Sequence, residues 1–98
     1  MIVKIHKKND ETIVAVCDES LLGQKFEENQ KQIDLTSDFY HGEKRDTKET
    51  GDLIRNADGV NLVGKESIQL GIDEGIIEET QVFTIQGIPY AQAVIIHK

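Results

Sequence analysis

Residues 59–67 nearly spell a phosphate-binding loop, since they fit the pattern G-x-x-x-x-G-K. Such a loop needs small residues whose N–H groups cradle phosphate, and a Ser or Thr after the lysine to hold magnesium. Here Glu66 follows the lysine, and its carboxylate would face the phosphate. The interior residues 60–63 are mostly apolar and typical of a buried strand. We therefore interpret the segment as a strand between two helices, and we expect no nucleotide cofactor.

The end of this motif still has the character of a helix N-terminus. Gly64 and Lys65 stand where the second of the two helices begins. Free N–H groups and the positive end of the helix dipole meet at such a point and attract anions. We expect Gly64 and Lys65 to form an anion-binding site.

Basic side chains form a second group, although the net charge of the chain is −7. Lys4, His6 and Lys8 share one face of a predicted strand, because strand side chains alternate with a period of two. Lys98 joins them if the first and last strands are neighbours, and Arg45 comes from a surface loop. We predict that these five residues contact RNA phosphates. The alternative is a solvated sheet edge whose lysines deter edge-to-edge pairing.

A third group consists of side chains that suit a small ligand. Gln86, Tyr90 and Gln92 surround a tight turn, and their polar groups can bind a ligand or the edge of a base. The alternative function is therefore a small-molecule enzyme or ligand binder, with a pocket near Cys17, Asn61 and Gln92. A ligand pocket of this kind is a concave site with a few convergent polar groups.

Neither the cysteine nor the histidines predict a metal site or a catalytic residue. No two histidines have metal-ligand spacing, although His6 and His97 would approach each other if the terminal strands paired. Cys17 has no cysteine partner for a disulfide. The carboxylates of Asp18 and Glu19 beside it disfavour a thiolate, so we interpret Cys17 as a buried structural residue.

These side chains must be positioned by one α+β domain that spans residues 1–98. The composition is ordinary for a globular domain, with 38% hydrophobic and 30% charged residues. The core formers are mainly Ile, Val and Leu, which favour a sheet. The predicted elements are a hairpin of residues 2–7 and 12–17, helices 46–57 and 65–74, a strand 60–63, and a hairpin of residues 80–86 and 90–97.

The arrangement of these elements follows from their patterns. Residues 12–17 are apolar on both faces and should lie centrally in a mixed sheet. Residues 60–63 and 80–86, with a helix between them, predict a β-α-β unit with a parallel strand pair. Residues 24–46 are irregular apart from one short strand at 32–36. Leu70 lies on the polar side of its helix and is a candidate contact in a homodimer.

Two local signals complete the predicted fold. Residues 18–23 form one helical turn, which Asp18 caps and Gly23 ends. No apolar run reaches the length of a membrane span, and no signal peptide precedes the first strand. We expect a cytoplasmic protein that does not bind membranes.

Several blocks of the sequence resemble a known family. They are Met1-Ile2-Val3-Lys4-Ile5-His6-Lys7, Val14-Ala15-Val16-Cys17-Asp18 with Leu22-Gly23, Asn61-Leu62-Val63-Gly64 with Ser67, and Gly87-Ile88-Pro89-Tyr90-Ala91-Gln92. Together they resemble the archaeal domain of unknown function 424. The resemblance implies a small cytoplasmic archaeal protein and brings no catalytic residues. Our preferred hypothesis is a non-enzymatic binding or interaction protein, associated with RNA, a ribonucleoprotein or the translation apparatus.

Overall fold

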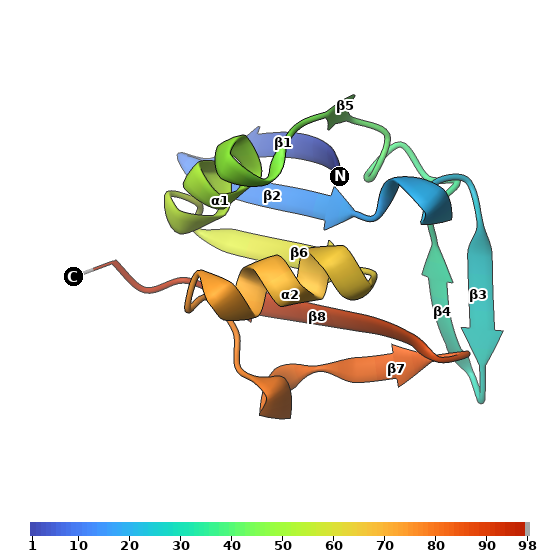
Figure 1. The fold of residues 1–98 in the computed structure, drawn as a ribbon. Helices are drawn as coiled ribbons and strands as arrows, with labels where there is room; N and C mark the ends of the chain where they lie inside the picture. The colour runs from blue at the N-terminus through green and yellow to red at the C-terminus, as the bar shows by residue number, and fades with distance from the viewer. Residues whose placement is uncertain (98) are drawn as a thin grey trace.

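The computed structural model describes residues 1–97, which form a six-stranded mixed sheet with two helices on one face (Figure 1). A separate two-stranded hairpin stands across one end of this sheet. The elements in chain order are β1 (Ile2–Lys8), β2 (Glu11–Cys17), the 3₁₀ turn η1 (Glu19–Leu21), β3 (Lys25–Glu28), β4 (Lys31–Asp34), β5 (Glu43–Lys44), α1 (Thr47–Arg55), β6 (Gly59–Val63), α2 (Lys65–Asp73), the 3₁₀ turn η2 (Glu79–Gln81), β7 (Phe83–Ile85) and β8 (Ile88–Val94). The predicted α+β class, with a mixed sheet and two main helices, is confirmed.

The strand order in the large sheet is β5-β1-β2-β6-β8-β7. The parallel pair is β2 with β6, where Val14 lies opposite Val60. Since α1 precedes β6, the β-α-β unit of the sheet runs from β2 through α1 to β6. As predicted, β2 is central and its last four residues are buried.

The predicted parallel pairing of residues 60–63 with 80–86 is wrong, because β8 lies between β6 and β7. Gln86 and Gly87 both have positive φ, at 51° and 77°. Two such residues make the tight turn that joins neighbouring antiparallel strands. β7 must therefore pair with β8, whose Ala91 and Ala93 are buried as an inner strand requires. Only residues 83–85 of the predicted strand 80–86 form β7, because η2 takes up its beginning.

The helices cover a core of alternate strand residues. Val16 and Leu62 from the sheet pack with Ile54 of α1 and Ile68 of α2. Leu70 belongs to the same core and is 5% exposed, so its predicted exposure is wrong. The helices α1 and α2 lie side by side on the sheet (Figure 1), so α1 covers one side of α2. The helical period alone assigns that side of α2 to solvent.

The opposite face of the sheet has a smaller core that closes its end. Cys17 and Val63 pack there with Leu35, which follows the hairpin of β3 and β4. The expectation of a largely irregular segment 24–46 missed β3, which pairs with β4 so that Phe26 lies opposite Ile33. Most other residues of these two strands are polar, so the sequence carries few of the apolar positions that indicate a strand.

Candidate ligand site on the open face of the sheet

A cavity of about 550 Å³ opens on the face of the sheet that the helices leave uncovered. We call it the sheet-face cavity. Strands β4, β6, β7 and β8 and the loop before β5 contribute to it. Its lining residues are Lys31, Ile33, Tyr40, Asn61, Leu62, Val63, Phe83, Tyr90, Ala91 and Gln92.

Two amide side chains stand next to each other in this cavity. Asn61 of β6 lies opposite Gln92 of β8 in the antiparallel register. Two residues further along, Val63 lies opposite Tyr90. Strand side chains alternate, so all four of these residues lie on one face of the sheet. Within residues 1–97 neither amide side chain is engaged in a hydrogen bond, so both can offer a donor and an acceptor to a ligand.

Aromatic rings form another wall of the cavity. Phe83 lies opposite Tyr90 across β7 and β8, and their ring centroids are 5.9 Å apart with an interplanar angle of 34°. Phe83 is 57% exposed, which is unusual for so large an apolar side chain. The ammonium of Lys31 lies 5.8 Å from the centre of the Phe83 ring. An exposed ring beside a cation can stack a flat group and attract an anionic one attached to it.

Burial raises the pKa of Tyr40, which lines the cavity, and of Cys17, which lies in the core. Burial, with a smaller contribution from Cys17, raises the pKa of Tyr40 to about 12. The phenol therefore stays protonated and remains a hydrogen-bond donor at neutral pH. Burial and the adjacent carboxylate of Asp18 raise the pKa of Cys17 to about 11. The thiol is fully buried and neutral, which agrees with the structural role predicted for it.

Three of the five residues predicted for a ligand pocket line the cavity: Asn61, Tyr90 and Gln92. Cys17 lies in the core beside Val63 and does not reach the cavity surface. Gln86 lies at the turn between β7 and β8, where its backbone and side chain donate hydrogen bonds to Glu28 and Glu27. It therefore holds the β3–β4 hairpin against the sheet.

The predicted basic residues separate into two shallow depressions along β1. Lys4 and Arg45 line one of about 310 Å³ together with His41, whose carbonyl oxygen lies 3.4 Å from the Lys4 ammonium. His6 and Lys8 line the other, of about 390 Å³, together with Phe39.

His6 is held firmly in place. Its ring stacks on Phe39 at a centroid distance of 4.3 Å, and its Nε2 lies 2.9 Å from the Phe39 carbonyl oxygen. A carbonyl oxygen only accepts, so this nitrogen carries the proton. Lys4 shares a lateral row of the sheet with Ala15, Asn61 and Gln92, and so it faces the same side as the cavity.

Arg45 is engaged by carboxylates, and the basic residues near the C-terminus lie away from β1. Arg45 forms ion pairs of 3.5 Å with Glu43 and Glu49, and its Nε is buried without a hydrogen-bond partner in the described structure. β1 and β8 are separated by β2 and β6, so the terminal strands are not neighbours. His97 instead lies with its Nε2 2.9 Å from the carbonyl oxygen of Ala57, which precedes β6, whereas His6 is on β1. Lys98 lies outside the described residues.

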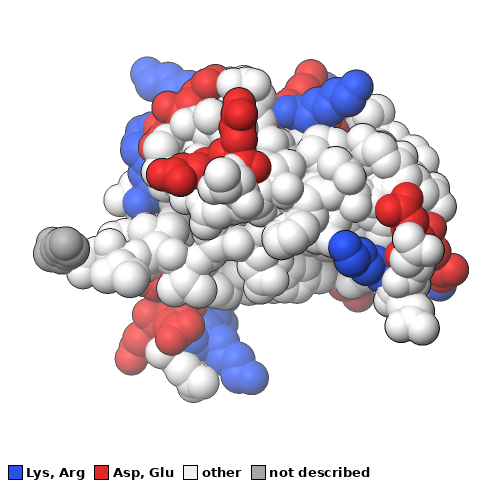
Figure 2. Space-filling model, turned by 90° about the horizontal axis from the view of Figure 1, so that it is seen from below, with Lys and Arg blue, Asp and Glu red and all other residues white. Residues whose placement is uncertain are grey.

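Charged side chains do not form one continuous basic surface on the lower side of the molecule. Figure 2 shows this side with a broad uncharged middle, and blue and red atoms alternate around its margin. This side therefore lacks the strong positive potential that attracts a polyanion over a distance.

The N-terminus of α2, where Gly64 and Lys65 were predicted to bind an anion, already holds the carboxylate of Asp18. Asp18 Oδ2 accepts from the Glu66 N–H at 3.1 Å, and Oδ1 accepts from the N–H and the hydroxyl of Ser67, both at 2.8 Å. These donors are engaged within the chain and cannot bind an external anion. Asp18 makes no side-chain cap for η1, because its carboxylate caps α2 instead.

Within residues 1–97 no group of three His, Cys, Asp or Glu side chains is placed to hold a metal ion. Over the same residues, neither helix has the length and apolar character needed to cross a membrane.

The sequence did not single out Lys31 or Phe83 as site residues. Phe83 is separated from Tyr90 by a tight turn, so a hairpin prediction could have placed the two rings on one face. Lys31 could not have been found this way, because the β3–β4 hairpin that brings it to the cavity has no clear sequence pattern.

The chain is similar to a known protein family and to a solved structure. A family model described as "Protein of unknown function (DUF424)" matches residues 6–96. The chain is similar to the crystal structure of an uncharacterized conserved protein from Methanopyrus kandleri, with a TM-score of 0.82 and 22% sequence identity. That match covers 99% of this chain and 92% of the other, and at this identity it shows the fold alone. Among curated proteins the comparison finds no relative of this chain.

Proposed function

The chain belongs to the DUF424 family, and from that premise we propose that it is a non-enzymatic binding protein for single-stranded RNA. The proposed site is the sheet-face cavity, extended toward Lys4 and His6 on the same face. The single observation that carries the proposal is the combination of the exposed Phe83 ring with two unengaged amides, Asn61 and Gln92, in one cavity.

Each part of this cavity suits a part of a nucleotide. A base can stack on Phe83 and Tyr90, and stacking of this kind contributes about 1–3 kcal/mol per base. The amides of Asn61 and Gln92 each offer a donor and an acceptor, as the edges of bases require. Lys31, beside the Phe83 ring, is placed to meet a phosphate.

The charge of the protein limits how RNA can be held. The net charge is −7, so long-range attraction to RNA is absent. Phosphate contacts are restricted to a few side chains, and we propose Lys31 with the previously predicted Lys4, His6, Lys8 and Arg45. Each neutralised phosphate adds about −0.7 to the slope of log affinity against log salt for a single strand. If all five side chains neutralise a phosphate, we expect a slope of about −3.5.

A small molecule with a flat ring is the second candidate ligand, because the cavity of about 550 Å³ has the size of a small-ligand pocket. The small molecule would contact the same residues as RNA. The two candidates differ in how binding depends on ligand length. A mononucleotide would bind as tightly as an oligonucleotide in this case. If RNA is the ligand, affinity rises with each nucleotide that reaches the basic side chains of β1.

The test is a titration of fluorescently labelled RNA, from one to eight nucleotides long, measured by anisotropy at low and moderate salt. We expect Phe83→Ala to weaken binding of the eight-nucleotide RNA about tenfold, through lost stacking. Phe83→Leu keeps an apolar side chain without a ring and should weaken it nearly as much. Thr84→Ala, on the opposite face of β7, is the matched control and should have no effect. Failure of every RNA to bind at low salt would contradict the proposal.

A further inference from the structure

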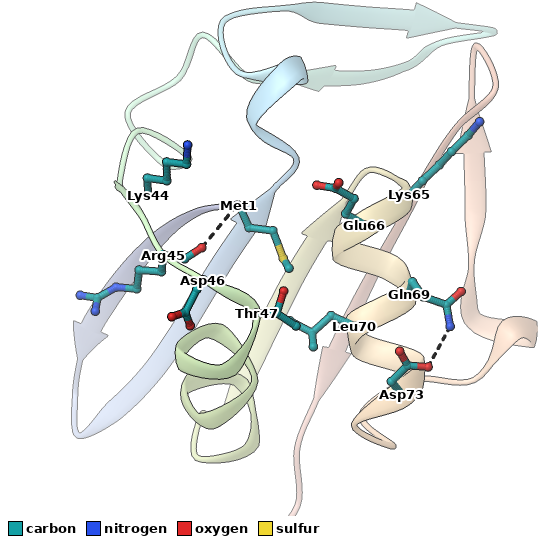
Figure 3. A pocket seen from close by; sticks show the side chains of 10 residues that line it. All are labelled: Met1, Lys44, Arg45, Asp46, Thr47, Lys65, Glu66, Gln69, Leu70 and Asp73. Carbon is teal, nitrogen blue, oxygen red and sulfur yellow. Dashed lines mark hydrogen bonds between the residues drawn. The ribbon is translucent and has the colours of Figure 1, made fainter.

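A second cavity, of about 560 Å³, lies on the helix side of the sheet, between the first turn of α1 and the outer side of α2 (Figure 3). We call it the helix cleft. Met1 enters it from the start of β1, and Leu70 reaches from α2 toward Thr47 of α1. These two apolar side chains form its floor, where Met1 is partly exposed and Leu70 is 5% exposed. The cleft is thus distinct from the sheet-face cavity, which opens on the other face.

Cations line the rim of the cleft but point away from its floor. In Figure 3 the side chains of Lys44, Arg45 and Lys65 extend outward from Met1 and Leu70. Two of the three are paired outside the cleft. The Lys44 ammonium lies 3.2 Å from a Glu19 carboxylate oxygen, and Arg45 pairs with Glu43 and Glu49.

Carboxylates face the cleft without a cationic partner. Glu66 extends from the first turn of α2 toward Met1 in Figure 3. Asp73, at the other end of α2, accepts a hydrogen bond of 2.8 Å from the side-chain amide of Gln69. Within residues 1–97 neither carboxylate takes part in an ion pair. The cleft therefore combines an apolar floor with two carboxylates along α2 that are unpaired in the described structure, while Lys65 points away from the floor.

We propose that the helix cleft binds a basic amphipathic segment of a partner protein. An apolar side chain of that segment would lie over Met1 and Leu70, and its Lys or Arg residues would lie beside Glu66 and Asp73. Long basic side chains suit such a site, since their stems cover apolar surface while the charged ends reach carboxylates. The inference stands apart from the proposed RNA site, because the two cavities open on opposite faces.

The charge of the chain favours such a partner over a second copy of itself. At a net charge of −7, two copies repel each other, whereas a basic partner is attracted. The most basic segment of the chain, residues 2–8, is a strand paired with β2 and β5. It cannot leave the sheet to fill the cleft of another copy without breaking that pairing.

The probe for the test is a labelled twelve-residue helical peptide of Leu and Lys, with an otherwise identical peptide of Leu and Glu for comparison. We expect the Lys peptide to bind and the Glu peptide not to bind. The double variant Glu66→Lys with Asp73→Lys should weaken binding of the Lys peptide about tenfold, since two attractions become repulsions. The matched control is Glu11→Lys with Glu79→Lys, two exposed residues outside the cleft that give the same net charge.

Each result decides the inference. Equal binding of the two peptides would overturn it, and so would an equal loss in the cleft variant and the control variant. Concentration-dependent dimerisation that the cleft variant abolishes would show that a second copy fills the cleft, which also overturns it. RNA binding of the cleft variant is measured in parallel. Its persistence, with loss of peptide binding, separates this inference from the proposed RNA function.

Discussion

Asp18 accepts two hydrogen bonds of 2.8 Å from Ser67, one from the backbone N–H and one from the hydroxyl, across 49 positions of sequence. Both residues are buried. The contact fixes the C-terminal end of β2 against the first turn of α2. Since β2 and β6 are neighbours in the sheet and β6 leads directly into α2, it also sets where the helix begins over the sheet.

Replacement of Asp18 by Asn should destabilise the protein by about 1–3 kcal/mol. The change removes a buried charge that three donors and a helix N-terminus stabilise, and it leaves a donor where an acceptor is needed. Urea denaturation followed by circular dichroism measures the loss. The exposed Asp38→Asn is the control, and an equal effect in both variants would show that the contact does not stabilise the fold.

Replacement of Gly64 by Ala should be costly for two reasons. Gly64 has a φ of 108°, and a Cβ there would overlap the Asp18 carboxyl group. We expect a loss of about 3 kcal/mol, since strain and displacement of the carboxylate add. Gly23 has a φ of 86° with no atom near its Cβ position, so Gly23→Ala measures the backbone strain alone, at about 1 kcal/mol. Equal losses at the two positions would show that Asp18 does not pack against Gly64 as described.

Stability should fall as the pH rises above about 9. Cys17 has a pKa of about 11 in the folded protein against an ordinary value of 9.0. Between these values the unfolded chain has lost the thiol proton and the folded chain keeps it, so ionisation favours unfolding. Urea denaturation at pH 8 and pH 10.5 should show a loss of about 2 kcal/mol from Cys17, with a smaller loss from Tyr40, whose pKa is raised to about 12. Cys17→Ala should lose much less over that interval, and a slope equal to that of the original protein would contradict this assignment.

The same burial predicts that Cys17 is unreactive in the folded protein. Its side chain is fully buried, and its neutral form is a poor nucleophile. A thiol-specific disulfide reagent at pH 8 should label it only after urea is added. Rapid labelling in buffer, at a rate independent of urea, would show that the segment carrying Cys17 is open.

The sequence predicts those parts of this fold that local chemistry determines. Asp46 accepts a hydrogen bond from the Glu49 N–H at the start of α1, and Gly75 follows α2 with a φ of 72°, so residue type alone indicates these helix ends. The apolar pattern of residues 12–17 likewise predicts a central strand. Strand order was not accessible, because a β-α-β pattern fits both β2 with β6 and β6 with β7. Only the pairing of β8 with both β6 and β7 decides between them.

The site was partly predictable for the same reason. Asn61, Tyr90 and Gln92 were identified from residue type alone, and cross-strand pairing brings them together. The true environments of Leu70 and Asp18 depend on partners distant in sequence, α1 for the first and Ser67 for the second. Helical periodicity and capping rules consider only residues that are close in sequence. They therefore predict an exposed Leu70 and an Asp18 that caps its own helical turn, and both predictions are wrong.

The central claim is that single-stranded RNA binds in the sheet-face cavity. The most direct measurement is a set of amide chemical shifts from the ¹⁵N-labelled protein, recorded while an eight-nucleotide RNA is added. The account predicts shifts concentrated at Asn61, Phe83, Tyr90 and Gln92, with weaker ones at Lys4 and His6 and none along α1. Shifts confined to other surfaces, or no shifts at low salt, would contradict it.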